Sequence, residues 1–248
     1  MGRMSHHANV FSPPGTPLSQ RTVGELVAER PNRSRVFQAF GMDFCCQGGR
    51  ALQAACEGKG VPVETVIEQL EAELADKTAT GPNPADLPAG ELCQYIVTTH
   101  HGFLRREFPR LHAMAERVAH VHGGHTPPLV EVFEVFQGLE TELASHMMKE
   151  EQILFPAIVQ LSQGNHAVMP LDGPITCMLH EHNDAEDNLA RLRELTHGFQ
   201  PPAEACNTYR ALFSGLADLE DDLHRHIHLE NAVLFPTAQA MAAGTQTA

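Results

Sequence analysis

The chain has 248 residues, of which 42% are hydrophobic and 19% charged, a composition that supports a folded core plus a smaller module and excludes disorder throughout. Its formal net charge of −14 opposes binding to nucleic acid or to an anionic membrane surface. Neither a signal-peptide core nor an apolar run of transmembrane length is visible, so we expect a cytoplasmic protein that engages no membrane.

The N-terminal part of the chain is expected to form a small helical domain. Residues 1–20 mix Pro, Gly, Ser and His without periodicity, which is typical of a flexible tail. Over residues 21–76 short helical patterns follow one another, and Thr22 with Glu25 indicates a capping box at the first of them. A Pro- and Gly-rich stretch over residues 77–88 then has the composition of a linker.

This small domain contains two adjacent cysteines, Cys45 and Cys46. The six cysteines of the chain show no CxxC spacing, which argues against a zinc ribbon or a thioredoxin-type site, and no disulfide-framework density. We therefore expect reduced thiols. Spacing alone leaves the role of the adjacent pair open, whereas small buried apolar residues are expected at Cys56, Cys93, Cys177 and Cys206.

Four long helical patterns follow, separated by Gly- and Pro-rich breaks. They cover residues 89–120, 127–162, 173–197 and 203–241. Long helices with short connections are typical of a four-helix bundle. We therefore predict an all-α chain, with a bundle over residues 89–243 preceded by the cysteine-containing domain.

The most informative feature is an internal repeat, in which the pattern HxxxExxxLFP occurs twice at an offset of 80 residues. The first copy contains His146 and Glu150, and the second contains His226 and Glu230. Residues four apart share one helix face, so each His and its Glu can point at the same object. Two copies suggest a two-fold site.

The apolar spacing of each helix shows which face is buried. In the second helix one inward stripe contains Leu129, Val132, Phe136, Leu139, Leu143, His146, Glu150, Ile153 and Ala157. In the fourth helix the stripe contains Tyr209, Leu212, Leu216, Leu219, Leu223, His226, Glu230 and Val233. Two carboxylates are thus placed in an apolar interior, where they require cations or strong donors.

The same test sorts the other histidines. The seams of the first and third helices contain His101, His122 and His182. Because Gly123 and Gly124 end the first helix, His120 or His125 could take the place of His122. Four other histidines and one glutamate lie outside these buried stripes and are expected to be solvated: His100, Glu151, His180, His224 and His228.

Imidazoles together with carboxylates suit iron, manganese or zinc, and ligand type alone does not choose among these metals. Five or six histidines and two glutamates exceed what one tetrahedral zinc accepts, but they fit two near-octahedral ions bridged by both carboxylates. Iron is the first choice, because histidine-rich pairs favour a redox-active metal.

The segments SHMMKEEQILFP and HIHLENAVLFP, with GMDFCCQGGR upstream, resemble the hemerythrin-like di-iron proteins of the iron-sulfur cluster repair family, also called repair of iron centres. The resemblance spans about residues 20–240. It implies a hemerythrin-like four-helix bundle with two non-haem iron ions, bridged by an oxo or hydroxo group. The implied ligands are His101, His122, His146, His182 and His226, with Glu150 and Glu230 bridging.

The resemblance also implies a function. The protein would repair iron-sulfur clusters damaged by nitrosative or oxidative stress, by supplying iron to the cluster proteins that are its partners. Cys45 and Cys46 become candidate functional thiols. The alternatives are reduction of nitric oxide at the di-iron centre, or binding and sensing of oxygen or nitric oxide. A homodimer is compatible with the sequence, which does not require one.

Overall fold

The computed structural model describes residues 12, 13, 15–75, 83–165 and 169–245. Within these residues all regular structure is helical, apart from an isolated bridge between Thr22 and Ala51. Most of the predicted tail (1–11 and 14) and part of the predicted linker (77–82) lie outside the described residues. No described helix is long and apolar enough to cross a membrane.

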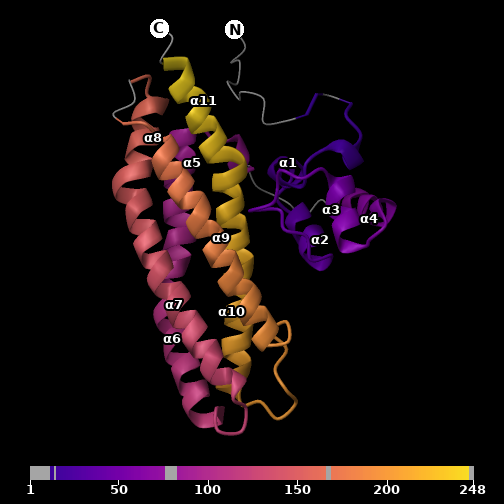
Figure 1. Cartoon of the computed structure of the whole chain (residues 1–248), viewed down its shortest axis with the longest axis vertical. Coiled ribbons are helices and arrows are strands. Elements are labelled where there is room, and N and C mark those ends of the chain that lie inside the picture. The colour runs from indigo at the N-terminus through magenta and orange to yellow at the C-terminus, as the bar shows by residue number, and fades with distance from the viewer. Residues whose placement is uncertain (1–11, 14, 76–82, 166–168, 246–248) are drawn as a thin grey trace. The chain divides into compact units, whose positions relative to one another are not determined.

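Short helices come first and long helical runs follow. The first group comprises the 3-10 turn η1 (Leu18–Gln20), α1 (Val23–Glu29), α2 (Arg33–Ala39), α3 (Leu52–Lys59), α4 (Val63–Ala75) and the 3-10 turn η2 (Pro84–Asp86). The long runs are α5 (Ala89–Ile96), η3 (Val97–His101) and α6 (Gly102–His122); α7 (Pro128–Lys149), η4 (Glu150–Leu154) and α8 (Phe155–Ser162); α9 (Asp172–Leu195); and α10 (Asn207–Leu229), η5 (Glu230–Leu234) and α11 (Phe235–Thr245). The prediction of an all-α chain with a bundle of long helices is confirmed (Figure 1).

Two compact units are formed by the described residues. One contains the chain up to Cys93 together with 157–172 and the part from His224 onward, and the other contains 94–156 and 173–223. Each unit combines segments that are far apart in the sequence. The domain limits expected from the sequence therefore stay a prediction.

In the second unit, four helical runs are linked in a closed ring by side-chain pairs. The pairs are His112 with Glu140 (2.6 Å), Glu131 with Arg191 (2.8 Å), Arg193 with Glu220 (2.8 Å) and Asp222 with His100 (3.0 Å). They join α6 to α7, α7 to α9, α9 to α10 and α10 back to η3. Inside this ring Phe108 and Phe136 meet edge to face with ring centroids 6.2 Å apart. This packing is that of a four-helix bundle.

In the first unit, the short helices are fixed by a local cap and by long-range ion pairs to Glu73. The Thr22 side chain accepts a hydrogen bond from the Glu25 backbone N–H at 3.2 Å, which confirms the predicted cap of α1. Arg30 donates to both carboxylate oxygens of Glu73 at 3.0 and 3.1 Å and so joins the end of α1 to α4. The fully buried ring of Phe37 lies in the core of this domain.

Three segments of the long runs are π-helical: η3, η4 and η5. The segments η4 and η5 each end two residues before a proline, Pro156 and Pro236. A proline cannot donate to the carbonyl four residues earlier and its ring crowds that carbonyl, so a wider turn relieves both problems. The wider turn also rotates the following residues. Ile153, which the regular spacing places on the inward stripe, is 49% exposed, and Leu154 is buried instead.

Candidate metal centre

Six side chains that the sequence singled out are buried, and they come from π-helical segments or their flanks and from α9. His101 ends η3, His146 lies one turn before η4, and Glu150 begins η4. His182 lies in α9, and the second repeat places His226 at the end of α10 and Glu230 at the start of η5. Exposure is at most 2% for all six. The predicted burial of both glutamates is therefore observed.

Glu150 faces two different histidines. Its Oε2 lies 3.3 Å from Nε2 of His101, and its Oε1 lies 3.3 Å from Nε2 of His146. A carboxylate whose two oxygens each face a different imidazole nitrogen could bridge two cations, one beside each histidine. Next to His146 a third imidazole joins the group, since Nε2 of His182 lies 3.2 Å from Nε2 of His146.

In His101 and His146, the ring nitrogen that points away from Glu150 is held by a carboxylate. Nδ1 of His101 donates to Glu151 at 2.6 Å, and Nδ1 of His146 donates to Glu181 at 2.9 Å. Because an ionised carboxylate only accepts, Nδ1 carries the proton in both rings, and in the neutral imidazole the lone pair is then on Nε2, the atom that faces Glu150. This pattern is common among metal-binding histidines.

Both outer carboxylates are held in the ionised form. Burial raises the pKa of Glu151, but hydrogen bonds from Arg105 and His101 outweigh it and bring that pKa below its ordinary value. Burial likewise raises the pKa of Glu181, and hydrogen bonds from Lys149 and His146 again outweigh it. The sequence interpretation treated Glu151 as solvated and overlooked Glu181. Their positions, directly after Glu150 and directly before His182, were the available signal.

The second repeat forms a matching pair within the first unit. Nε2 of His226 lies 3.1 Å from Oε1 of Glu230, and both side chains are buried. The spacing of four residues that suggested this pair therefore does bring the imidazole and the carboxylate together.

Within the second unit, the donor atoms of His101, His146, Glu150 and His182 lie next to one another, and within the first unit those of His226 and Glu230 do the same. We refer to these two sets as the donor groups. Two buried clusters of His and Glu are consistent with a dinuclear metal site. The gathering of both HxxxE repeats around one centre stays a prediction.

The donor set fits cations on physical grounds. Glu150 is 0% exposed, and neither of its oxygens accepts a hydrogen bond from any described residue. A carboxylate buried in this way costs several kcal/mol unless a positive charge compensates it. The adjacent Nε2 lone pairs of His101 and His146 add electron density at the same place, which a metal cation would neutralise.

His122 is not brought to this group. It lies at the other end of the 21-residue α6 from His101, about 30 Å along the helix axis at 1.5 Å per residue. There its Nε2 lies 3.5 Å from the thiol of Cys206, and its ring packs against Tyr209. The alternatives His120 and His125 are exposed residues at the same end of α6.

Other positions differ from the sequence expectation as well. His100 is buried and bonded to Asp222, because the π-helical turn η3 places two consecutive histidines inside. His228 is also buried, and it donates from Nδ1 to the carbonyl of Phe44 at 3.2 Å. Burial lowers the pKa of His228 to about 4. The expectation of solvated side chains at these two positions was wrong, whereas His180 is exposed as predicted.

The adjacent cysteines lie in the same compact unit as the second repeat. Asp43 accepts hydrogen bonds from the backbone N–H groups of Cys45 and Cys46 at 2.9 and 2.8 Å, and this fixes the turn. Asn231, which follows Glu230, donates to the carbonyl of Cys45 at 3.2 Å and lies 3.9 Å from the Cys46 sulfur. Of the other four cysteines, Cys56 and Cys93 are buried as expected, but Cys177 and Cys206 are exposed.

Comparison with known proteins agrees with this geometry. The family model described as Hemerythrin HHE cation binding domain matches residues 94–238, and the ScdA_N model, described as Domain of Unknown function (DUF542), matches residues 19–74. Iron-sulfur cluster repair protein YtfE of Edwardsiella ictaluri is 41% identical over 221 residues, which cover 88% of this chain and 96% of the relative. Iron-sulfur cluster repair protein ScdA of Staphylococcus haemolyticus is 35% identical over 217 residues, which cover 88% and 97%. The chain therefore belongs to the family of iron-sulfur cluster repair proteins that combine an ScdA_N domain with a hemerythrin domain.

Proposed function

We propose that this chain holds two non-haem iron ions and supplies iron for the repair of damaged iron-sulfur clusters in other proteins. The observation that carries the proposal is the placement of Glu150, whose two buried oxygens face His101 and His146 at 3.3 Å each. Relatives of this chain in Edwardsiella ictaluri and Staphylococcus haemolyticus are named as iron-sulfur cluster repair proteins. The recipients would be proteins that have lost iron from a cluster.

The residues of this chain have distinct roles in the proposal. His101, His146, His182 and His226 would each donate one nitrogen, and Glu150 and Glu230 would each bridge with two oxygens. Four imidazoles and two bridging carboxylates fill about eight of the twelve positions of two octahedral ions. When bound, iron would supply redox and Lewis-acid chemistry. Positions left to solvent would make the metals exchangeable, which a protein that supplies iron requires.

Cys45 and Cys46 are proposed to assist as functional thiols. Their segment is hydrogen bonded to Asn231, the neighbour of Glu230, and neither cysteine forms a disulfide with a described residue. A thiolate is a good ligand for iron in transit, so a thiol near the metal-binding helix could receive iron on its way to a recipient. The double substitution Cys45→Ser, Cys46→Ser should leave iron content at two per chain and slow the transfer.

The test is an anaerobic transfer assay. The iron-loaded chain is mixed with a cluster enzyme whose cluster has been damaged by nitric oxide, in the presence of sulfide and a thiol reductant. Recovery of the recipient's activity should follow the loss of iron from this chain. A Glu150→Leu, Glu230→Leu variant, which should bind no iron, is the control. Unchanged iron on the donor, or equal recovery with the control variant, would refute iron supply.

A second candidate function is the reduction of nitric oxide, which the free coordination positions favour. Reduced protein mixed anaerobically with nitric oxide should then release nitrous oxide over many turnovers. A stable nitrosyl adduct without nitrous oxide would instead support binding or sensing of the gas. Both measurements use the same iron-loaded chain, so they can be compared directly with the transfer assay.

A further inference from the structure

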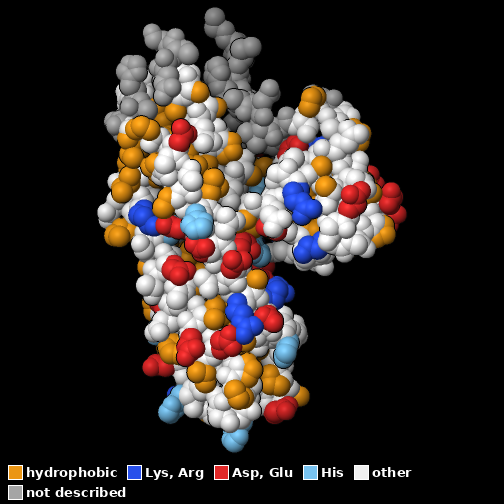
Figure 2. Space-filling view, in the orientation of Figure 1, with side chains coloured by type: hydrophobic (Ala, Val, Ile, Leu, Met, Phe, Trp, Pro, Cys, Tyr) orange, Lys and Arg blue, Asp and Glu red, His pale blue; other side chains and the backbone are white. Residues whose placement is uncertain are grey.

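A cavity of about 570 Å³ lies in the second unit, at the opposite end of α6 from His101. Its walls come from the loop between α6 and α7, the loop between α9 and α10, and the first turns of α7 and α10. Figure 2 shows histidine side chains on the surface at this end of the long helices. Three imidazoles line the cavity, those of His122, His125 and His197. The function proposed above uses none of them.

Tyr209 brings a buried polar group to this cavity. The residue lines the cavity and is 5% exposed, and its hydroxyl group makes no hydrogen bond to any described residue. Its ring packs against His122 and meets Phe213 edge to face, with ring centroids 5.6 and 4.7 Å apart. Burial raises the pKa of the phenol, so the group is a neutral donor. A buried hydroxyl is costly without a partner, and a ligand in the cavity can provide one.

A thiol stands at the edge of the cavity. Cys206 is exposed, and its Sγ lies 3.5 Å from Nε2 of His122, within hydrogen-bonding distance for sulfur. The two residues before it, Glu204 and Ala205, belong to the cavity wall. An imidazole nitrogen at this distance can take the thiol proton while the sulfur attacks an electrophile. An electrophile held in the cavity therefore meets a thiol that has a base beside it.

The loop after α9 is held in an unusual conformation. His197, Gly198 and Phe199 have φ angles of 52°, 74° and 60°, in the left-handed region that residues other than glycine rarely adopt. Phe199 is buried, and its backbone N–H donates to the hydroxyl of Thr196 at 3.0 Å. Strained backbone of this kind persists only where the surrounding structure determines it. The position of His197 on the cavity wall is therefore built into the fold.

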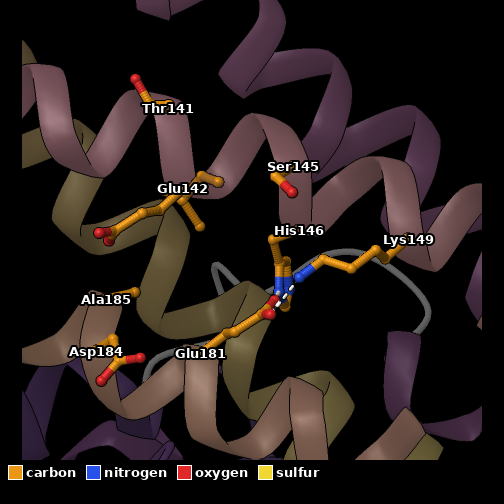
Figure 3. Close-up of a pocket in the computed structure, with 9 residues that line it drawn as sticks. Thr141, Glu142, Ser145, His146, Lys149, Glu181, Asp184 and Ala185 are labelled. Carbon is orange, nitrogen blue, oxygen red and sulfur yellow. Dashed lines mark hydrogen bonds and ion pairs between the residues drawn. The ribbon is translucent and has the colours of Figure 1, made fainter.

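The other exposed cysteine, Cys177 in α9, has a neighbour of the opposite kind. Its thiol donates to Glu181 at 3.4 Å, and Figure 3 shows the Glu181 carboxylate directed at His146 and Lys149. The hydrogen bond to Glu181 is the main reason why the pKa of the Cys177 thiol is raised. Because the thiolate is the nucleophile, this carboxylate opposes reaction at Cys177. The chain thus carries two exposed thiols, one beside a base and one beside an anion.

We propose that the cavity binds a low-molecular-weight peptide disulfide and that Cys206 undergoes thiol–disulfide exchange with it. The volume lies in the range of small-molecule sites. The ligand's carboxylates accept hydrogen bonds from His125, His197 and Tyr209. The Cys206 proton passes to Nε2 of His122, the Cys206 sulfur bonds to one sulfur of the disulfide, and the S–S bond of the ligand breaks. The departing thiolate then takes up the proton, so the exchange needs no further oxidant.

This modification site goes beyond the proposed function, because it uses no residue of the donor groups. The test incubates the iron-loaded chain anaerobically with glutathione disulfide and locates the adducts by peptide mass analysis. The rate at Cys206 should level off as the disulfide concentration rises, because the cavity fills before exchange. It should exceed the rate at Cys177 by about tenfold. Equal rates at the two thiols, or a rate at Cys206 that rises linearly with concentration, would overturn the proposal.

Two substitutions separate binding from exchange. Tyr209→Phe removes only the hydroxyl, and it should raise the disulfide concentration at half-maximal rate about fivefold, as expected for the loss of one hydrogen bond. His122→Asn removes the base and should lower the maximal rate about tenfold. Tyr95→Phe changes the chain's other tyrosine, which lies outside the cavity, and should alter neither quantity. Parent kinetics in Tyr209→Phe, or equal effects in Tyr95→Phe, would show that the cavity does not bind the disulfide.

Discussion

Asn231 donates a hydrogen bond to the carbonyl of Cys45 at 3.2 Å, and so ties the turn that holds the adjacent cysteines to the residue that follows Glu230. The same amide lies 3.9 Å from the Cys46 sulfur. The two features that the sequence presents as separate motifs, the cysteine pair and the second HxxxE repeat, are thus in contact within one compact unit.

Asn231→Ala should loosen the cysteine turn without removing a metal donor. The rate at which Cys46 reacts with a thiol reagent should increase about threefold, as expected when roughly one hydrogen bond of moderate strength is lost. Iron content should stay at that of the parent protein. Asn188→Ala, in α9, removes a hydrogen bond of similar length to Glu142 and serves as the control. Equal thiol reactivity in the two variants would show that Asn231 does not hold the turn.

Glu150→Gln should have opposite effects on the metal-loaded and metal-free chain. The amide keeps the shape of the side chain but cannot bridge two cations, so both irons should be lost or bound weakly. Without metal, the same substitution removes a buried charge and should raise the free energy of unfolding by about 1–3 kcal/mol. Metal analysis and thermal unfolding in a chelator measure the two effects. A metal-free variant less stable than the metal-free parent would contradict the role of Glu150.

Loss of the outer carboxylates should weaken metal binding without removing a ligand. Glu151→Gln and Glu181→Gln should each lower metal affinity by about 10–100-fold, because the amide no longer fixes the Nδ1–H form of the histidine beside it. Competition with a chelator of known affinity measures this. The substitution Glu140→Gln disturbs a comparable histidine pair, that of His112, outside the donor groups, and it should leave the affinity unchanged.

His122→Ala should bind as much iron as the parent chain, since His122 lies at the far end of α6 from the donor groups. His182→Ala should lose at least the iron beside His146, because two of the nitrogen donors at that position are His182 and His146. Iron content and the visible absorption spectrum of the two variants compare them directly. Loss of iron from His122→Ala would restore it as a candidate ligand.

Glu25 should contribute stability that depends on pH. Burial raises its pKa, but hydrogen bonds from Ser12 and Arg21 outweigh it and bring the pKa below the ordinary value. A carboxylate with a depressed folded-state pKa stabilises the fold above its unfolded-state pKa, and this contribution is lost as the pH falls through the folded-state value. Glu25→Gln should therefore cost about 1–2 kcal/mol near neutral pH. The difference from the parent should shrink in unfolding curves recorded at progressively lower pH.

The spacing of residues along each helix was sufficient to predict which helix faces are buried and which His and Glu residues form pairs. The spacing of three and four residues placed His101, His146 and His182 on buried faces, and the repeat at an offset of 80 paired two imidazoles with two carboxylates. These features are local, because the position of a residue on a helix determines the direction of its side chain.

Position along the bundle and the neighbours on other elements were decided by the tertiary structure. His122 has the same seam position as His101 but lies at the other end of α6, and helical periodicity specifies a face without specifying a level along the axis. His228 looks solvent-facing from its own helix, yet Phe44 from the N-terminal domain covers it. Glu181 contacts the candidate centre only because α9 packs beside α7, which brings its carboxylate within hydrogen-bonding distance of His146. Contacts between elements distant in sequence depend on how the helices pack, which no pattern within a single helix contains.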